Sequence, residues 1–146
     1  VFTHPPSILF VVAPYYASIT NQLVTGATEE VKKVKGKIDI VEVPGALEIP
    51  TAIKFAQKYF SGFIALGCVI RGETSHYETV SNESSRALSL LGLEGLCIGN
   101  GILTVENYVQ AESRANPADQ NKGGDAAMAC LTLIDLKNRF AQPQAS

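Results

Sequence analysis

Residues 63–78 read Phe63-Ile-Ala-Leu-Gly-Cys-Val-Ile-Arg-Gly-Glu-Thr-Ser-His-Tyr-Glu78. The unbroken apolar run from Phe63 to Ile70 is typical of a strand that is covered on both faces. The run ends at a charged residue and a glycine, and Ser75 with Glu78 then forms a capping box that predicts the start of a helix. This stretch therefore predicts a buried strand, a polar turn and a helix, the repeating unit of an α/β fold.

The same alternation continues through the whole chain. Further strands are expected at 8–13, 38–43 and 96–103, and helices at about 19–36, 50–59, 75–92, 104–114 and 125–140. We expect Thr104 to cap the fourth helix, Asp125 to open the fifth, and Gly99 with Gly101 to weaken the fourth strand. The expected apolar face of the fifth helix consists of Ala126, Ala129, Cys130, Leu133, Leu136 and Phe140. This order predicts a three-layer α/β sandwich with a four-stranded parallel sheet and helices on both faces.

The composition indicates one globular domain over residues 1–146, with mobile ends at about 1–6 and 141–146. Hydrophobic residues make up 46% of the chain and charged residues 18%, which is typical of a folded protein. The net charge is −2, and the short basic group at 32–37 is interpreted as a solvated helix end, so no nucleic-acid partner is expected.

The cysteines and the hydropathy pattern point to a cytoplasmic protein. Cys68, Cys97 and Cys130 lie far apart in apolar surroundings without zinc-like spacing, so we expect buried thiols in a reducing compartment and no metal site. No apolar run is long enough to span a bilayer, and the first residues lack a signal-peptide pattern. No membrane partner is therefore expected.

Ligands of parallel α/β sheets bind beyond the carboxyl ends of the strands. In this chain that rule selects three loops, at 14–18, 44–48 and 71–76. The amides that follow Gly72 in the third loop suit a phosphate or carboxylate, although an ordinary strand-to-helix turn has the same composition. His76 is placed in the first turn of the next helix, where the dipole disfavours its charged form, so it would accept a proton near pH 7; an inconsequential surface histidine is the equal alternative.

Other polar and aromatic residues allow two interpretations each. Of Tyr15 and Tyr16, one is expected to stack on a flat heterocycle and the other to close the edge of the core. Glu48 would bind ligand hydroxyls or simply favour a helix start. Arg114 suits phosphate, but on the sequence alone the favoured role of Arg114 and Lys122 is to complement helix charge. Both lie away from the three loops, and a neighbouring subunit could supply them to the site.

Four segments, in this order along the chain, carry a resemblance to a known family. They are Val43-Pro-Gly-Ala-Leu-Glu-Ile-Pro50, the stretch from Gly67 to Glu78, Gly101-Ile-Leu-Thr-Val-Glu-Asn107 and Asn121-Lys-Gly-Gly-Asp125. The chain resembles 6,7-dimethyl-8-ribityllumazine synthase from about Ile8 to Phe140. The resemblance implies a flavodoxin-like fold and a transferase of riboflavin biosynthesis. Such an enzyme condenses 5-amino-6-ribitylaminouracil with 3,4-dihydroxy-2-butanone 4-phosphate, without cofactor or metal, at a site between subunits of a homopentamer.

The resemblance also implies a role for individual residues. Tyr15 would stack on the pyrimidine, Glu48 would bind the ribityl chain, and His76 would transfer protons. Backbone groups that meet the ring or its substituents would come from Ala46, Leu47, Val69 and Ile70. The phosphate would be held by Gly72, Glu73, Thr74 and Arg114. The residues contributed by the neighbouring subunit would be Asn100, Arg114 and Lys122.

Two departures from the family pattern limit these expectations. Asn100 stands where members often carry an apolar or aromatic residue, so its role is left open. The segment 116–120 departs from the Gly/Lys-rich stretch of icosahedral members, which favours a pentamer or a pair of pentamers over a shell. Riboflavin synthase is a candidate partner. The alternative function is a non-catalytic pentamer that binds flavin or lumazine, against which His76 and Arg114 argue.

Overall fold

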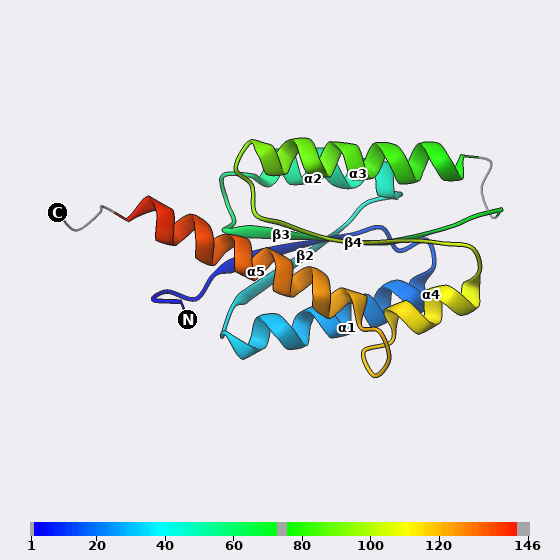
Figure 1. Ribbon diagram of the computed structural model, residues 1–146, viewed down its shortest axis with the longest axis horizontal. Helices are drawn as coiled ribbons and strands as arrows, with labels where there is room; N and C mark the ends of the chain where they lie inside the picture. The colour runs from blue at the N-terminus through cyan, green and yellow to red at the C-terminus, as the bar shows by residue number, and fades with distance from the viewer. Residues whose placement is uncertain (1, 73–75, 143–146) are drawn as a thin grey trace.

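The computed structural model describes residues 2–72 and 76–142 and shows a sheet between two layers of helices (Figure 1). The strands are β1 (Ser7–Val12), β2 (Lys37–Glu42), β3 (Gly62–Ile70) and β4 (Ile98–Val105). All neighbouring strands pair in parallel, in the order β2-β1-β3-β4. The helices are α1 (Ala17–Lys33), α2 (Ile49–Ala56), α3 (Tyr77–Leu93), α4 (Tyr108–Ala115) and α5 (Lys122–Ala141), with a short 3-10 turn η1 (Ala46–Glu48) before α2.

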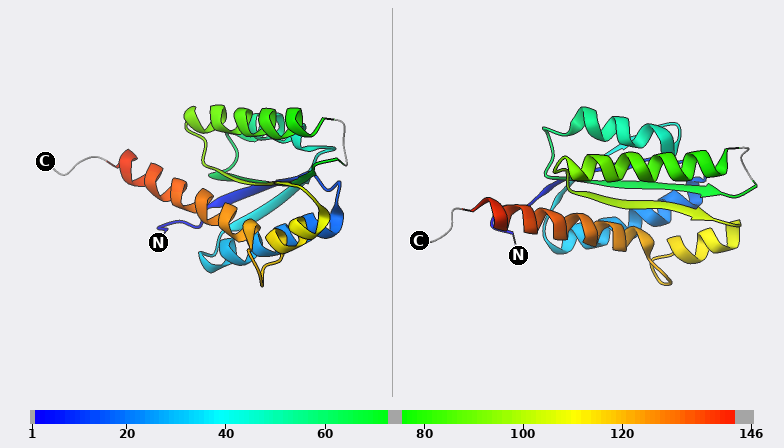
Figure 2. Two further views of the ribbon diagram at one scale, coloured as in Figure 1. Left: turned by 45° about the vertical axis from the view of Figure 1, so that its right-hand side comes forward. Right: turned by 45° about the horizontal axis from the view of Figure 1, so that its top comes forward.

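Helices α2 and α3 cover one face of the sheet, and α1, α4 and α5 cover the other (Figures 1 and 2). The expected α/β sandwich with a four-stranded parallel sheet is thereby confirmed. None of the helices within residues 2–72 and 76–142 is long and apolar enough to cross a lipid bilayer.

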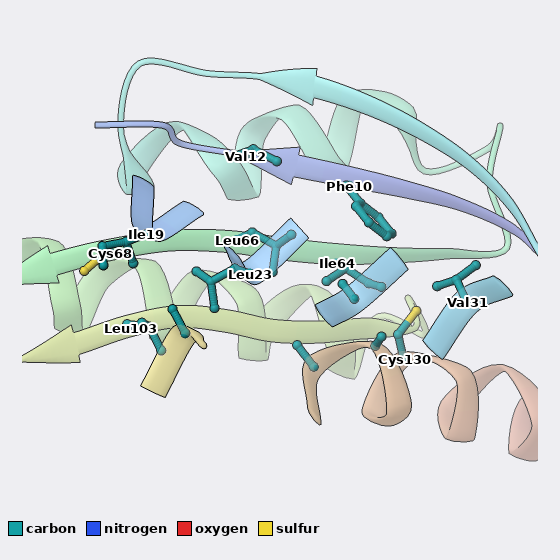
Figure 3. Packing of buried hydrophobic residues seen from close by; sticks show 14 of the residues in the cluster. Phe10, Val12, Ile19, Leu23, Val31, Ile64, Leu66, Cys68, Leu103 and Cys130 are labelled. Carbon is teal, nitrogen blue, oxygen red and sulfur yellow. The ribbon is translucent and has the colours of Figure 1, made fainter. Parts of the chain in front are cut away.

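The core is divided by the sheet, because successive strand residues point to opposite faces. Phe10 and Val12 of β1 join Ile64 and Leu66 of β3 on the α1 face, where Leu23 packs against them (Figure 3). The intervening residues of β1 and β3 pack with α2 and α3 on the other face. All nine residues of β3 are buried, which explains the unbroken apolar run that the sequence shows there.

Two helix starts differ from the expected ones. Thr104 belongs to β4, since the β3–β4 pairing continues to Val105, and α4 is capped by Asn107, whose Oδ1 accepts a hydrogen bond from the amide of Gln110 at 2.9 Å. The last helix begins before Asp125, after Asn121, whose Oδ1 accepts from the amide of Gly124 at 3.2 Å. The predicted cap at Ser75 lies outside the described residues, and so do residues 1 and 143–146 of the expected mobile ends.

The prediction of which α5 residues are buried is partly wrong. Ala126 and Cys130 are buried as expected, but Ala129 and Leu133 are exposed, and so is Phe140, with 83% of its surface accessible. The buried face instead continues through Ala127, Leu131 and Ile134. The reason is that α5 lies in the groove between β4 and α1 and is buried against both, so its buried face is wider and rotated.

Gly99 and Gly101 are sites of close packing, which corrects the expectation that they weaken β4. A Cβ atom on Gly99 would lie 1.9 Å from the carbonyl oxygen of Ala126 in α5. On the other side of α5, a Cβ atom on Gly123 would lie 2.1 Å from the carbonyl oxygen of Leu23 in α1. Glycine at both positions therefore lets α5 approach β4 and α1 backbone to backbone.

Candidate active site

The loops after β1 and β2 meet beside the end of β3, as the sequence predicts. They enclose a cavity of about 160 Å³, called here the loop-side cavity. Its walls include Tyr15, Tyr16, Ala46, Leu47, Cys68 and Val69. Most of this surface is apolar or aromatic, so the cavity suits a flat, weakly polar ring more than a free anion.

The two tyrosines of the first loop have different surroundings. Tyr15 is 71% exposed, whereas Tyr16 packs against the main core. The ring of Tyr16 lies edge-on to Tyr15, with centroids 4.9 Å apart, and to Tyr108 of α4 at 6.5 Å. The hydroxyl of Tyr108 also hydrogen-bonds Ser18. Tyr15 is therefore the ring that a ligand can reach, and Tyr16 supports it.

The second loop places a carboxylate beside the cavity wall. Ala46 is buried, and the half-exposed Leu47 leads into Glu48, which occupies the N-cap position of α2. The Glu48 side chain is exposed and makes no capping hydrogen bond. Its carboxylate is therefore not used by the helix backbone and can reach a ligand hydroxyl.

The backbone beyond β3 turns at Gly72. Val69 and Ile70 are buried, and the amide of Arg71 donates to the carbonyl of Val105 at 2.8 Å. Gly72 has φ +82°, a conformation that favours glycine, and among the described residues no atom other than those of its chain neighbours lies within 4 Å of the position that a Cβ would occupy. The expected phosphate-binding residues Glu73 and Thr74 lie outside the described residues.

His76 lies at the N-cap of α3, one position before the first turn in which the sequence places it. Its backbone carbonyl accepts a hydrogen bond from the amide of Val80 at 2.9 Å, and its side chain is exposed. The imidazole therefore stands at the same end of the sheet as Gly72, where a bound substrate can reach it.

The expected cationic residues line a second cavity of about 510 Å³, called here the β4-side cavity. Arg114 is half-buried there and its Nη1 lies 3.5 Å from the carbonyl oxygen of Thr104, while Lys122 Nζ lies 3.7 Å from Asp125 Oδ2. Asn100 also lines this cavity and its Oδ1 accepts from the amide of Ile102 at 3.0 Å. Among the described residues the two cavities share no lining residue, so Arg114 and Lys122 line a different cavity from Tyr15.

Comparison with known proteins identifies the family. The family model described as 6,7-dimethyl-8-ribityllumazine synthase matches residues 5–138. A 6,7-dimethyl-8-ribityllumazine synthase of Bartonella henselae is 54% identical over 92% of this chain and 90% of its own length. The enzyme of that name from Jannaschia sp. is 49% identical over 99% of this chain and 83% of its own length. The chain belongs to the 6,7-dimethyl-8-ribityllumazine synthase family.

Membership of the lumazine synthase family confirms the expected class of protein, a transferase of riboflavin biosynthesis that acts on small molecules. The roles of the individual site residues and the pentamer stay predictions. The alternative of a non-catalytic binding protein is not favoured, because the relatives carry the name of the enzyme.

The three thiols of this lumazine synthase family member are unsuited to nucleophilic chemistry. Burial raises the pKa of Cys68, in the cavity wall, to about 11 and that of Cys130 to about 12. Burial also raises the pKa of Cys97. All three are therefore protonated at neutral pH. Within residues 2–72 and 76–142, no group of three His, Cys, Asp or Glu side chains is arranged to hold a metal ion.

Sequence reasoning did not assign a role to Arg71, the residue that joins β3 to Gly72. In the structure its guanidinium contacts carboxylates from two other elements, Glu106 after β4 and Glu78 in α3. The only signal in the sequence is that a charged residue follows the buried strand directly. Its partners could not be found that way, because Glu106 is 35 residues further along the chain.

Proposed function

We propose that the chain condenses 5-amino-6-ribitylaminouracil with 3,4-dihydroxy-2-butanone 4-phosphate and releases 6,7-dimethyl-8-ribityllumazine, phosphate and water. Family membership supports this reaction. The observation that carries the assignment of the site is the contrast between the loop-side cavity, suited to a ring, and the β4-side cavity, which contains Arg114 and Lys122.

The pyrimidine occupies the loop-side cavity in this proposal. Tyr15 is exposed at its mouth and stacks on the ring. Glu48 receives the hydroxyls of the ribityl chain, since its carboxylate is exposed and does not cap α2. The polar edge of the ring meets the backbone of Val69 and Ile70 in β3, and Ala46 and Leu47 in η1 offer further backbone groups.

The phosphate of the second substrate binds beside Gly72. The positive φ of Gly72 and the lack of a side chain at this position favour close approach of an oxygen to the backbone. Glu73 and Thr74 are proposed to add their amides, and Arg114 supplies positive charge. Because phosphate leaves during the reaction, a cation that stabilises its developing charge speeds that step.

His76 transfers protons in the proposed reaction. Imine formation and ring closure both require a proton to be moved between nitrogen, oxygen and carbon atoms of the substrates. The imidazole is exposed at the N-cap of α3, close in sequence to Gly72. Correct orientation of two bound substrates provides much of the remaining rate, so His76 shares the work with binding.

The complete site lies between two subunits of a homopentamer in this proposal. Asn100, Arg114 and Lys122 of one subunit face the loop-side cavity of the next, which accounts for cavities without a common residue. Large apolar side chains that remain exposed on the single chain are consistent with an assembly, including Phe55, Tyr59, Leu93 and Val109. Light scattering on the purified protein measures the assembly and distinguishes one pentamer from two or from a shell.

Two finer features complete the proposal. Riboflavin synthase, another enzyme of riboflavin biosynthesis, is the proposed partner. The cytoplasm is the proposed compartment, and three free, buried cysteines are consistent with reducing surroundings.

Turnover tests the reaction. Mixing the purified protein with both substrates should raise lumazine absorbance well above the spontaneous rate. The same rate with and without protein would contradict the enzyme and would favour the binding protein.

A mixing experiment tests the shared site. Tyr15→Ala damages the loop-side cavity and Arg114→Ala damages the β4-side cavity. If the two variants are unfolded together and reassembled, about a quarter of the sites in a random ring combine two intact halves. Activity should therefore return to about a quarter of the wild-type value. A mixture no more active than the average of its parents would show that each site belongs to one subunit.

A further inference from the structure

Arg71 is held in place by the sheet and reaches two carboxylates. Its amide donates to the carbonyl of Val105 at 2.8 Å, which extends the β3–β4 pairing by one residue. Its Nε lies 3.0 Å from Glu106 Oε2, and its Nη1 lies 3.7 Å from Glu78 Oε1. The guanidinium also stacks on Tyr77, with Cζ 4.7 Å from the ring centroid.

The two carboxylates come from the elements that border Gly72 and His76. Glu106 occupies the turn from β4 to α4, and its amide donates to Gln110 Oε1 at 2.8 Å. Glu78 lies in the first turn of α3, two residues after His76. Arg71 therefore links the turn before α4 to the start of α3, directly next to the glycine that we assign to the phosphate.

These charges matter more for an anionic ligand than for folding. The side chains of Arg71, Glu78 and Glu106 are all more than half exposed, and exposed ion pairs contribute little to stability. A phosphate dianion beside Gly72, however, would be repelled by two uncompensated carboxylates. Like charges brought near a ligand weaken its binding and steer it away.

We propose that Arg71 is a positioning residue for the phosphate substrate: it pairs with the carboxylates of Glu78 and Glu106 and neutralises their charge beside Gly72. The proposal rests on the proposed phosphate site at Gly72. Arg71 acts through the two carboxylates in this role, and its Nε, its Nη1 and one face of its guanidinium are already engaged with protein groups.

The decisive variants are Arg71→Gln and the double variant Arg71→Gln with Glu106→Gln. We expect Arg71→Gln to raise the KM for the butanone phosphate and the inhibition constant of inorganic phosphate roughly fivefold, and to leave the KM for the pyrimidine unchanged. The double variant should recover most of this loss, because the repelling charge is gone. Added salt should shrink the difference between Arg71→Gln and the wild type.

Arg86→Gln is the matched control. Arg86 pairs with Glu83 within α3, Nη2 to Oε2 at 2.8 Å, so the variant removes the same charge from an exposed ion pair on the helix that begins beside His76. Its KM for the butanone phosphate should equal that of the wild type. Light scattering confirms that every variant keeps the wild-type assembly.

Three results would overturn the proposal. A double variant no better than Arg71→Gln would show that Arg71 contacts the phosphate itself or only supports the fold. An Arg71→Gln protein that behaves like Arg86→Gln would show that the pairs have no role in binding. If Arg71→Gln fails to assemble, Glu106→Gln alone decides, because compensation predicts a KM for the butanone phosphate that is roughly half the wild-type value, and an unchanged KM contradicts it.

Arg114→Ala separates this proposal from the assigned phosphate site. If Arg114→Ala leaves the KM for the butanone phosphate unchanged, the phosphate site itself is wrong. If Arg114→Ala raises that KM while Arg71→Gln does not, only the role of Arg71 is wrong.

Discussion

The loop-side cavity and the β4-side cavity are lined by different kinds of residue. The first, of about 160 Å³, is walled by aromatic and apolar side chains and by the backbone that follows buried strands. The second, of about 510 Å³, is wider and contains Asn100, Arg114 and Lys122. Its shape depends on α5, which reaches β4 and α1 only because glycines allow the contact.

This difference indicates how binding of the two substrates is divided between the two cavities in the proposal. In the proposal, a flat ring is held by surfaces that the sheet makes rigid, and a phosphate is met by the charge of Arg114 in the last turn of α4. Binding in the loop-side cavity should therefore be sensitive to changes in side-chain shape. Phosphate binding by the residues of the β4-side cavity should be sensitive to charge and to the position of α5.

The largest effect is expected where the β4-side cavity depends on a close backbone contact. Gly99→Ala places a Cβ 1.9 Å from the carbonyl oxygen of Ala126, so we expect the free energy of unfolding to fall by about 3 kcal/mol. The control is Gly92→Ala, whose Cβ would have no neighbour within 4 Å and which should be neutral or stabilising. Urea denaturation at one protein concentration measures both, and equal stabilities would refute the close contact.

Removal of the Arg114 charge from the β4-side cavity should mainly weaken binding of the butanone phosphate. Arg114→Ala is expected to raise the KM for the butanone phosphate by roughly 30-fold, the value of a charge-assisted hydrogen bond, with a far smaller effect on the KM for the pyrimidine. Arg139→Ala, which removes a charge near the far end of α5, is the control. Steady-state kinetics with each substrate varied in turn provides the measurement. Equal increases for both substrates would contradict the division between the two cavities.

Loss of the proton-transfer residue should reduce turnover more than binding. His76→Ala is expected to lower kcat by about 10- to 100-fold and to change either KM by less than about twofold. Activity should persist, because both substrates are still oriented. His4→Ala removes the only other histidine and should match the wild type. A His76→Ala enzyme with unchanged kcat and a raised KM would make His76 a binding residue.

The smallest effect concerns the thiol in the wall of the loop-side cavity. Burial raises the pKa of Cys68 from 9.0 to about 11, so this thiol stabilises the fold fully below pH 9 and ceases to do so as the pH rises through 11. At pH 8 its alkylation should be slow in the native protein and fast in urea. Bound lumazine should slow the alkylation of Cys68 further and leave Cys97 and Cys130 unaffected. Equal protection of all three would place the ligand elsewhere.

The sequence predicts those parts of the fold that local patterns determine. The apolar run of β3 is unbroken because helices cover both of its faces, and the same relation between pattern and burial holds for β1. The cap of α4 was misassigned because the end of β4 depends on its pairing with β3. The buried face of α5 was misjudged because two partners, β4 and α1, share it.

For the site, too, the sequence predicts what local patterns determine and misses what depends on tertiary contacts. The rule for strand ends brings together the loops that carry Tyr15 and Leu47, which line one cavity, since it depends only on parallel strands. Spacing along the chain separates Arg114 and Lys122 from these loops and cannot show that both line one cavity. The contacts of Arg71 with Glu106 and Glu78 arise only when β3, β4 and α3 are assembled.

The contact of α5 with β4 also bears on how this protein can evolve. At Gly99 and Gly123 two backbones meet with no side chain between them, and no amino acid is smaller than glycine. Any substitution at either position introduces a larger residue between the two backbones. The distance of α5 from β4 and from α1 is therefore set by these two glycines.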